Sequence, residues 1–124
     1  MSCVDCSKVI VKMCEDPKMG YGCFAKTKFR SGEVIETGLM MRLVDTDGNK
    51  NPHLFTWSDD RKVWAAGSGC LPFYNHSDNP NVKKVGDLEH DTMAIIALRD
   101  IEEGEQLCNT YSSAKWRECF QEFS

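Results

Sequence analysis

The cysteine and histidine residues of this sequence could support metal binding, redox chemistry or nucleophilic catalysis, depending on their spacing. Cys3-x-x-Cys6 has the spacing of half a zinc site, but neither a second Cys-x-x-Cys pair nor a histidine pair follows to complete four ligands. We therefore expect no metal ion in a functional site, and zinc at this pair only through a second chain. A thioredoxin-type motif would need a strand before the pair and a helix after it, and the sequence predicts neither.

His76 lies in the segment LPFYNHSDNPNV, residues 71–82, whose prolines and polar residues oppose a regular helix or long strand. Cys70 or Cys108 could form a catalytic pair with His76, but neither cysteine has the sequence context of an activated nucleophile. Taken alone, His76 is more typical of a loop histidine that binds backbone groups. Gly20-x-Gly22 is weak evidence of nucleotide binding, since no phosphate-binding lysine or long helix follows it.

Short runs of β-branched and other apolar residues, separated by glycine-rich and polar turns, predict a mainly β body. We expect residues 105–111, the last segment before the tail, to be a strand. The strand at residues 92–100 is expected to be buried on both faces. Only the C-terminal tail fits a helical period, with one apolar face. The expected strands are residues 8–12, 32–44, 62–69, 92–100 and 105–111, with turns or loops at 16–22 and 45–52, and the face of the tail is Trp116, Cys119, Phe120 and Phe123.

Two segments share the pattern apolar-x-x-Gly-Glu-x-apolar: FRSGEVI at residues 29–35 and IEEGEQL at residues 101–107. Each is typical of a strand end, a turn in which glycine adopts a positive φ, and the start of the next strand. Two copies are too few for a repeat protein. We therefore expect two similar hairpins.

The composition indicates one domain that functions inside the cell. The 124 residues suffice for a single core, and no apolar run reaches the ~18 residues of a membrane helix. The N-terminus lacks the charge order and apolar region of a signal peptide, and seven cysteines are expected as free thiols in a reducing compartment. We expect a nuclear or cytoplasmic protein that is not secreted. The net charge of −4, without a long basic cluster, disfavours nucleic acid and favours a basic peptide as partner.

Five sequence blocks follow one another in a characteristic order along nearly the whole chain. They are Gly20 to Ala25, Phe29 to Glu33, Asn75 to Asn81, Ala97 to Gln106, and Tyr111. In this order they resemble the SET-domain lysine methyltransferases, in which a G-[YW]-G-V-F-A segment, a Phe-x-x-Gly-Glu turn, an N-H-S-x-x-P-N segment and an A-x-x-x-I-x-x-G-E-E turn precede a closing tyrosine. The resemblance covers residues 8–116, and the length is similar to that of minimal viral SET proteins without zinc-binding flanks.

The resemblance implies a mainly β SET-domain (β-clip) fold of small curved sheets, with a C-terminal pseudoknot and a short C-terminal helix. Residues 1–7 would be an N-terminal extension and residues 8–124 a single SET domain. The segment around Asn75 would pack against the segment around Tyr111, which brings residues far apart in sequence into one site.

The resemblance also implies S-adenosyl-L-methionine as cofactor. Glycine beside the cofactor would let the backbone come close to it. His76 would position the cofactor and tether neighbouring backbone rather than act as a base, and Tyr111 would be the catalytic residue that orients the amine. The residues implied to bind the cofactor are Met19, Gly20, Tyr21, Asn75, His76, Tyr111 and Trp116.

A narrow substrate channel would bring a lysine amine to the cofactor, and aromatic walls there would suit a cation. The channel residues implied are His53, Phe55, Trp57, Phe73, Tyr74 and Asn109. Two of them differ from the usual pattern. His53 stands where many relatives carry a channel tyrosine, and Asn109 where relatives often carry the Phe or Tyr that limits how many methyl groups are added, so an amide there would favour lower methylation.

The function implied is an S-adenosylmethionine-dependent protein-lysine N-methyltransferase that acts on a basic tail such as a histone tail. Two alternatives stay open. The first is a catalytically weak or inactive SET-like module used for binding or interaction, and the second is a related β-clip binding domain without a cofactor. The absence of flanking zinc domains favours a homodimer, and no nucleic acid or membrane is expected as partner.

Overall fold

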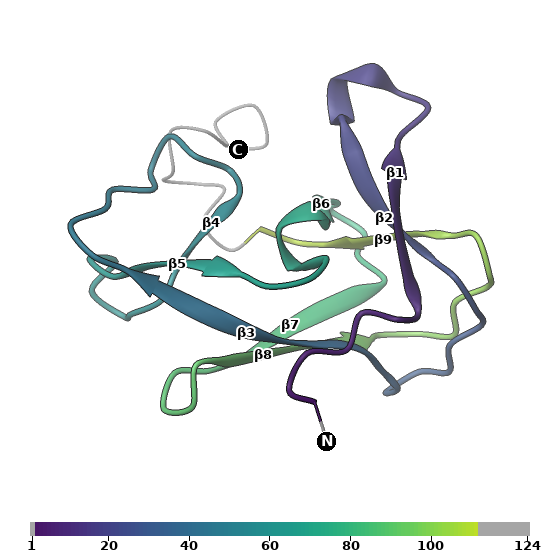
Figure 1. Cartoon of the computed structure of the whole chain (residues 1–124). Coiled ribbons are helices and arrows are strands. Elements are labelled where there is room, and N and C mark those ends of the chain that lie inside the picture. Colours follow the sequence, from purple (N-terminus) through teal and green to yellow (C-terminus); the bar gives the residue numbers. More distant parts are fainter. Residues whose placement is uncertain (1, 112–124) are drawn as a thin grey trace.

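The computed structural model describes residues 2–111, whose strands form two curved sheets (Figure 1). The helical elements of this part are two 3-10 turns, η1 (Pro17–Met19) and η2 (Leu71–Phe73). No helix in residues 2–111 is long and apolar enough to cross a membrane. The mainly β fold is as expected, whereas the predicted C-terminal helix, which contains Trp116, Cys119, Phe120 and Phe123, lies outside the described residues.

The first sheet has the strand order β1-β2-β9-β6. Its strands are β1 (Val9–Met13), β2 (Tyr21–Ala25), β9 (Gln106–Asn109) and β6 (Asn75–His76). β1 and β2 form an antiparallel hairpin that carries η1 at its tip, and Gly20 leaves this turn with a φ of 65°. β6 and β9 are parallel, with Asn75 opposite Cys108. This pairing confirms that the Asn75 segment packs beside the segment that leads to Tyr111.

The second sheet has the strand order β4-β5-β3-β8-β7, and all its neighbouring strands are antiparallel. Its strands are β4 (Leu54–Thr56), β5 (Trp64–Gly67), β3 (Val34–Leu43), β8 (Thr92–Ala97) and β7 (Val82–Asp87). The pairing of β3 with β8 shifts register between Val34 and Glu36. A bulge breaks the alternation of side chains along a strand. The consecutive residues Ile35 and Glu36 are accordingly both buried.

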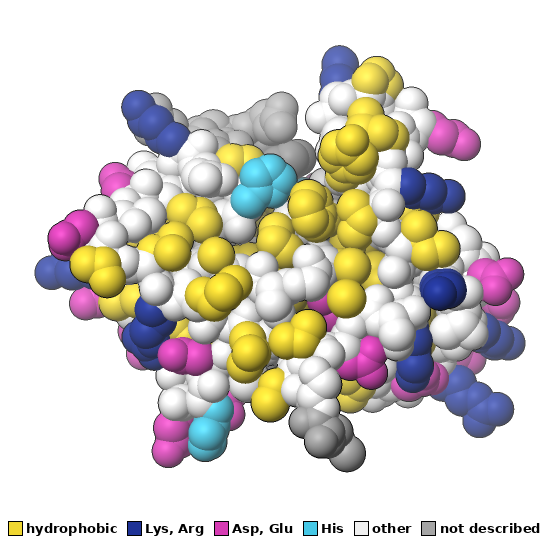
Figure 2. All heavy atoms as spheres, viewed as in Figure 1, with side chains coloured by type: hydrophobic (Ala, Val, Ile, Leu, Met, Phe, Trp, Pro, Cys, Tyr) yellow, Lys and Arg dark blue, Asp and Glu magenta, His cyan; other side chains and the backbone are white. Residues whose placement is uncertain are grey.

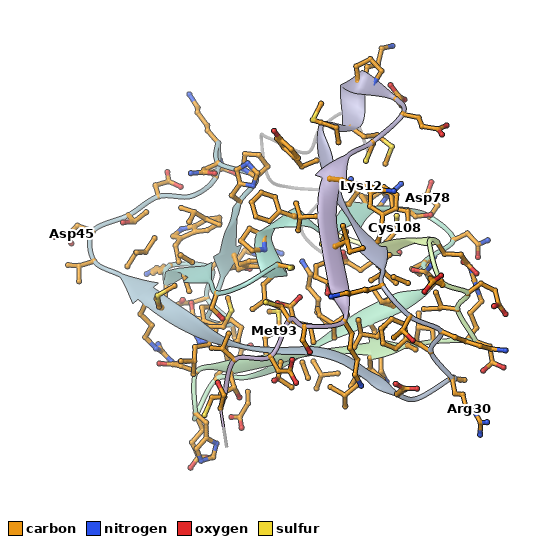
Figure 3. All side chains as sticks on the ribbon, turned by 45° about the vertical axis from the view of Figure 1, so that its right-hand side comes forward. Lys12, Arg30, Asp45, Asp78, Met93 and Cys108 are labelled. Atoms are coloured by element: carbon orange, nitrogen blue, oxygen red, sulfur yellow. The ribbon has the colours of Figure 1, made fainter. Side chains whose placement is uncertain are left out.

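The hydrophobic core joins the two sheets. Figure 3 shows Arg30 and Asp45 extending outward at opposite ends of the molecule and Met93 near its centre. Figure 2 shows hydrophobic side chains across the middle of one face, with charged side chains mainly at the edges. The most deeply buried large side chains are Tyr74, Phe29, Leu71, Ile95, Ile101, Leu107, Glu36, Val82 and Cys23.

Strand β8 packs against the core through one face only. Met93, Ile95 and Ala97 are buried, whereas the residues between them are half-buried. The expectation that residues 92–100 are buried on both faces is therefore wrong. An antiparallel sheet can leave one face partly open to water, unlike a parallel sheet covered by helices on both sides.

The two copies of the apolar-x-x-Gly-Glu pattern lie against each other. Phe29 and Ile101, the first residue of each copy, exchange both backbone hydrogen bonds at 2.9 Å. Gly32 and Gly104 have φ values of 85° and 89°, as the pattern predicts. The contacts are reciprocal, because the Gly32 N–H donates to the Ala97 carbonyl and the Gly104 N–H donates to the Ala25 carbonyl.

This reciprocal pairing connects the glycine of each copy to the strand that precedes the other copy. The first copy joins the strand that ends at Ala25 to β3, and the second joins β8 to β9. The repeat therefore fixes the two sheets relative to each other at one corner. It also sets where β9, the last strand before Tyr111, enters the first sheet.

Asn81, the last residue of the loop that follows β6, also holds β9 in place. The Asn81 side chain donates to the Gln106 carbonyl at 2.8 Å and accepts from the Cys108 N–H at 2.9 Å. Its own backbone N–H donates to the Cys108 carbonyl. Asn81 is 5% exposed, so these bonds are shielded from water. Residues 75–81 therefore fasten β9 in the position from which Tyr111 leaves the sheet.

Candidate active site

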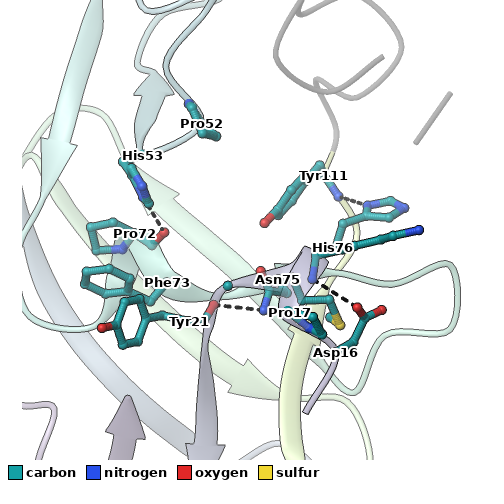
Figure 4. A pocket seen from close by; sticks show the side chains of 13 residues that line it. Asp16, Pro17, Tyr21, Pro52, His53, Pro72, Phe73, Asn75, His76 and Tyr111 are labelled. Carbon is teal, nitrogen blue, oxygen red and sulfur yellow. Dashed lines mark hydrogen bonds between the residues drawn. The ribbon is translucent and has the colours of Figure 1, made fainter. Parts of the chain in front are cut away.

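Two clefts lie next to each other in the described part of the chain. The first, of about 560 Å³, is formed by the tip of the β1–β2 hairpin, the loop before β4, the η2 turn and β6 (Figure 4). The second, of about 380 Å³, is formed by β4, β7 and the segment after β9. Both are lined by Pro52, Pro72 and Tyr111. Tyr111 is therefore a wall of both clefts.

Tyr111 is held by two hydrogen bonds. Its backbone N–H donates to Nδ1 of His76 at 2.9 Å, and its hydroxyl donates to the Tyr74 carbonyl at 2.7 Å. Because Nδ1 of His76 accepts, the proton of the neutral ring lies on Nε2, which is 2.9 Å from Asp78 Oδ1. The His76 side chain is 7% exposed and its ring lies 5.2 Å from the Tyr111 ring. His76 thus positions Tyr111 by a backbone contact and is not placed as a free base.

Tyr74 fixes the carbonyl that binds the Tyr111 hydroxyl. Its own hydroxyl donates to Glu36 Oε1 at 2.7 Å, and both side chains are buried. Burial raises the pKa of Tyr74, and the neighbouring Glu36 carboxylate raises it further, so the phenol keeps its proton. Burial also raises the pKa of Glu36. The anchored side chain of Tyr74 leaves its carbonyl little freedom to move.

Asn75 lies on the floor of the first cleft. Its Nδ2 donates to the Tyr21 carbonyl at 3.1 Å and to Gln106 Oε1 at 3.0 Å. A Cβ on Gly22 would lie 2.7 Å from Gln106 Oε1 and 2.9 Å from Asn75 Nδ2, so glycine is required for this packing. Within residues 2–111, Asn75 Oδ1 accepts no hydrogen bond. It is available to a donor in the cleft.

The rim of the first cleft is apolar and accessible. Met19 is 36% exposed and Tyr21 is 57% exposed, and both line the cleft with Gly20. Of the residues implied to bind the cofactor, the structure brings together Met19, Gly20, Tyr21, Asn75, His76 and Tyr111. Trp116 lies outside the described residues. Asp16, Pro17 and Lys18 line the same cleft because η1 forms the hairpin tip, and no sequence pattern pointed to them.

The second cleft has aromatic walls. Phe55, Trp57, Tyr74 and Tyr111 line it, and the Trp57 indole N–H donates to Asp91 Oδ1 at 2.8 Å. Asp91 also accepts from Arg42, whose hydrogen bond keeps the pKa of Asp91 below its usual value. Trp57 is consequently held in one orientation by a carboxylate that stays ionised.

Lys84 extends into the second cleft from β7. Its Nζ lies 4.3 Å from the centroid of the Phe55 ring and 5.7 Å from that of the Tyr111 ring. Ammonium groups at such distances are attracted to the electron-rich faces of aromatic rings. The walls of this cleft therefore accept a lysine ammonium group. No feature of the sequence pointed to Lys84, since its aromatic neighbours lie 29 and 27 positions away.

Asn109 also lines the second cleft and has a buried polar atom without a partner. The residue is 4% exposed, and its Oδ1 accepts no hydrogen bond from the described residues. Its Nδ2 donates only a long bond of 3.3 Å, to the Thr110 carbonyl. A buried unpaired carbonyl is costly and is normally satisfied by water or a ligand. Asn109 therefore places an unpaired acceptor, shielded from solvent, in the wall of the second cleft.

The structure separates two residues from the predicted channel group. His53 and Phe73 line the first cleft and not the second, with their rings 5.8 Å apart. Phe73, the last residue of η2, faces the first cleft (Figure 4). The Tyr74 side chain that follows is buried, and its hydroxyl binds Glu36. His53 and Phe73 therefore lie beside the first cleft, whereas Phe55, Trp57, Tyr74 and Asn109 line the second.

These elements define a class of protein: a β fold in which a parallel β6–β9 pair carries a tyrosine between two clefts. The SET domain family matches residues 20–112, and the chain belongs to this family. Solved structures agree in fold. A Plasmodium falciparum protein described as a candidate histone methyltransferase superposes with a TM-score of 0.68 at 20% identity, covering 88% of this chain and 96% of that chain.

Polycomb Repressive Complex 2 of Chaetomium thermophilum, in an autoinhibited conformation bound to S-adenosylmethionine, gives a TM-score of 0.69 at 21% identity. The match covers 88% of this chain and 16% of that one. At such identities the likeness shows the fold.

Curated relatives are histone-lysine N-methyltransferases. The chain is 31% identical over 68 residues to the H3 lysine-37 specific enzyme of Schizosaccharomyces pombe, covering 55% of this chain and 45% of that protein. It is 35% identical over 116 residues to the H3 lysine-36 specific enzyme of Aspergillus oryzae, covering 82% of this chain and 12% of that protein. The chain thus spans less than half the length of either relative.

Proposed function

We propose that this protein is an S-adenosylmethionine-dependent protein-lysine N-methyltransferase. The observation that carries the proposal is that two clefts meet at Tyr111, whose hydroxyl is held by the Tyr74 carbonyl. A methyl transfer needs a donor and an acceptor that approach from opposite sides along one line. Catalysis is then mainly a matter of orientation. Membership of the SET domain family and the histone-lysine methyltransferase relatives support the same reaction.

The first cleft fits the cofactor. Its volume of about 560 Å³ is in the range of small-molecule sites. Asn75 Oδ1 can accept from the amino group of the cofactor, and the apolar side chains of Met19 and Tyr21 can contact its adenosine or alkyl portions. Gly20 and Gly22 keep side chains out of the cleft floor and its lip. When bound, the cofactor supplies an electrophilic methyl group next to Tyr111.

The second cleft would receive the substrate lysine. At neutral pH only about one lysine side chain in a thousand is uncharged, so forming the reactive amine costs ~4 kcal/mol. Aromatic walls first attract the ammonium group. Desolvation in the cleft and the positive charge of Lys84 then both favour loss of the proton. The chain needs no dedicated base for this step.

The role proposed for Tyr111 is to orient the amine. Its hydroxyl donates its proton to the Tyr74 carbonyl, so toward an amine N–H the oxygen can act only as an acceptor. Asn109 lines the same cleft with a buried, unpaired Oδ1, and a small shift of its side chain would present this oxygen as a second acceptor. Two acceptors can fix the amine more firmly than one, and a water held by Asn109 would occupy space that a further methyl group needs. This supports lower degrees of methylation.

We further propose a basic protein tail, such as a histone tail, as substrate, and the nucleus as the place of action. The relatives methylate histone H3 by name, and the net charge of −4 favours a basic partner. The same proposal includes three further points. Residues 8–124 form the domain, Trp116 contacts the cofactor, and the protein forms a homodimer.

Cofactor titration by calorimetry tests the proposal against the binding-module alternative. We expect S-adenosylmethionine and its demethylated product to bind the full chain at one site. Asn75→Ala should weaken this binding at least tenfold, because it removes the acceptor on the cleft floor. Asn79→Ala is a matched control, because Asn79 is an exposed residue of the same segment and lines neither cleft. If neither compound binds the wild-type protein, the chain is not a methyltransferase.

A further inference from the structure

Three potential metal ligands converge outside the two clefts. The Sγ atoms of Cys6 and Cys70 and a carboxylate oxygen of Glu36 all lie within 4.8 Å of one another. They come from three separate segments. Cys6 follows Asp5, which pairs with Thr37 of β3; Glu36 lies in β3; and Cys70 precedes η2. The fold, and not sequence spacing, brings them together.

The distances are close to those of a metal site. In a tetrahedral zinc site with Zn–S bonds of ~2.3 Å, ligand atoms are ~3.8 Å apart. The three atoms would therefore have to move together by about 1 Å or less. Cys6 is only half-buried and lies in the N-terminal segment, which allows such a shift. Thiolate and carboxylate oxygen are both ligands that zinc accepts.

The charge of the group calls for a cation. Glu36 is 1% exposed, and its two oxygens accept from the Tyr74 hydroxyl at 2.7 Å and the Cys70 N–H at 2.9 Å. Over residues 2–111, no Lys, Arg or His side chain forms an ion pair with it. A buried carboxylate without a cation is expensive, and such charges are normally paired or bound to a metal.

The backbone at Gly69 leaves room beside these ligands. A Cβ at this position would lie 2.7 Å from Glu36 Oε2 and 3.2 Å from Cys6 Sγ. Gly69 also has a φ of 56°, which L side chains rarely adopt. The absence of a side chain at Gly69 therefore lets the backbone lie close to two of the three ligand atoms.

We infer that Cys6, Glu36 and Cys70 form a binding site for a divalent cation of the zinc class. Binding forms two metal–thiolate bonds and one bond to the ionised Glu36 carboxylate, releases the two thiol protons to solvent, and leaves the fourth position to water. Cys3, which is exposed, is not one of the three. The ion would tie the N-terminal segment to β3 and η2. It would also fix Glu36, which binds the Tyr74 hydroxyl. The backbone carbonyl of Tyr74 in turn binds the hydroxyl of Tyr111.

The full chain is first reduced and freed of metal with a strong chelator. Competition with a chromogenic chelator for Zn²⁺ then tests the inference. We expect one equivalent to bind to the wild type, and Cys6→Ser to bind at least tenfold more weakly. Cys108→Ser is the matched control, since Cys108 is a half-buried thiol of β9 outside the group, and should bind as the wild type does. Wild-type protein without bound Zn²⁺, or equal affinity of Cys6→Ser and wild type, would overturn the site.

A second measurement starts from the wild-type protein, whose fold no substitution disturbs. Co²⁺ added to the wild type should give the near-ultraviolet charge-transfer absorption of cobalt–thiolate bonds and the visible bands of tetrahedral coordination. Cys70→Ala should reduce the charge-transfer intensity by about half, since one of two thiolates is lost. Binding of Co²⁺ without the thiolate band would show that the cysteines are not ligands and would contradict the inference.

Discussion

The hydroxyl of Tyr111 donates to the backbone carbonyl of Tyr74 at 2.7 Å, although 37 positions separate the two residues. The Tyr74 side chain is in turn fixed by Glu36, which is buried through the bulge in β3. A chain of contacts therefore runs from the centre of the second sheet to the tyrosine between the clefts. The position of the hydroxyl depends on the core and not on a mobile surface loop.

Removal of this hydroxyl should abolish methyl transfer but leave the cofactor bound. For Tyr111→Phe we expect a fall in methyl transfer of about 100-fold or more, since one oriented polar group at a reacting centre contributes on this scale. Cofactor affinity should change by less than about threefold, because the first cleft keeps Asn75 and the ring of residue 111. Single-turnover kinetics and calorimetry measure the two effects. Full activity of Tyr111→Phe would refute the proposed role.

Gly22→Ala should damage the first cleft. The new Cβ would lie within 2.9 Å of Gln106, Cys14 and Asn75 side-chain atoms, so Asn75 must move. Overpacking of this kind costs about 1–3 kcal/mol, and we expect cofactor affinity to fall at least tenfold. Gly32→Ala is the control, because its φ of 85° makes alanine strained while nothing lies within 4 Å of the new Cβ. That variant should lose stability but bind the cofactor normally in calorimetry.

Asn109→Leu should stabilise the fold and change the product. Leucine removes the buried unpaired Oδ1, whose cost is about 1–3 kcal/mol, so we expect a gain of about 1 kcal/mol in the free energy of unfolding. Mass spectrometry of a methylated peptide should show a shift toward higher methylation, since no water is then held beside the amine.

Asn81→Leu is the comparison for Asn109→Leu. Asn81 is equally buried, but both ends of its amide bind β9. We expect this variant to lose about 2–3 kcal/mol in urea unfolding, because two backbone groups lose their partner. A loss of stability in Asn109→Leu as large as that in Asn81→Leu would mean that Asn109 Oδ1 has a partner in the folded protein. The expected gain would then be contradicted.

Glu36 should make stability depend on pH. Burial raises its pKa in the folded protein above the ordinary value of 4.5, so the folded state holds this proton more tightly than the unfolded state does. Its contribution is therefore largest below about pH 4.5 and is lost as the pH rises through the folded pKa. Without metal ions, the stability of wild type relative to Glu36→Gln should fall from pH 4 to pH 7.

The comparison with Glu36→Gln cancels groups that act in the opposite direction. Hydrogen bonds from Arg99 and Arg42 lower the pKa of Glu105 and of Asp91, so these carboxylates favour folding at higher pH in both proteins. Urea unfolding in a chelator-containing buffer at several pH values gives the difference. A difference that is constant with pH would mean that the pKa of Glu36 is not raised.

The sequence was informative where local chemistry decides the structure. The five predicted strands correspond to β1, β3, β5, β8 and β9, and the glycines of the two similar turns have the expected positive φ. Apolar alternation and turn glycines act over a few residues, so they are visible in the sequence. The order of the five sequence blocks also pointed to the SET domain family, which the match to residues 20–112 confirms.

Features that depend on tertiary contacts were not visible. β6 has only two residues and exists because β9 lies beside it, and β2, β4 and β7 were not predicted. Glu36 looked like an ordinary strand residue, because no periodicity reveals that a bulge turns it inward next to Tyr74. The same holds for Lys84, which reaches Phe55 and Tyr111 only in the folded chain. Contacts across many residues need the fold itself.

Transfer of a methyl group to a lysine of a histone H3 peptide, read by mass spectrometry, is the most direct test of the proposed function. Wild-type protein with S-adenosylmethionine should add the mass of one methyl group to a lysine residue, and Tyr111→Phe, with the cofactor still bound, should not. Binding of the cofactor by the wild type without transfer to any lysine across a panel of basic peptides and whole histones would contradict the claim that the two clefts meet at Tyr111 to methylate lysine.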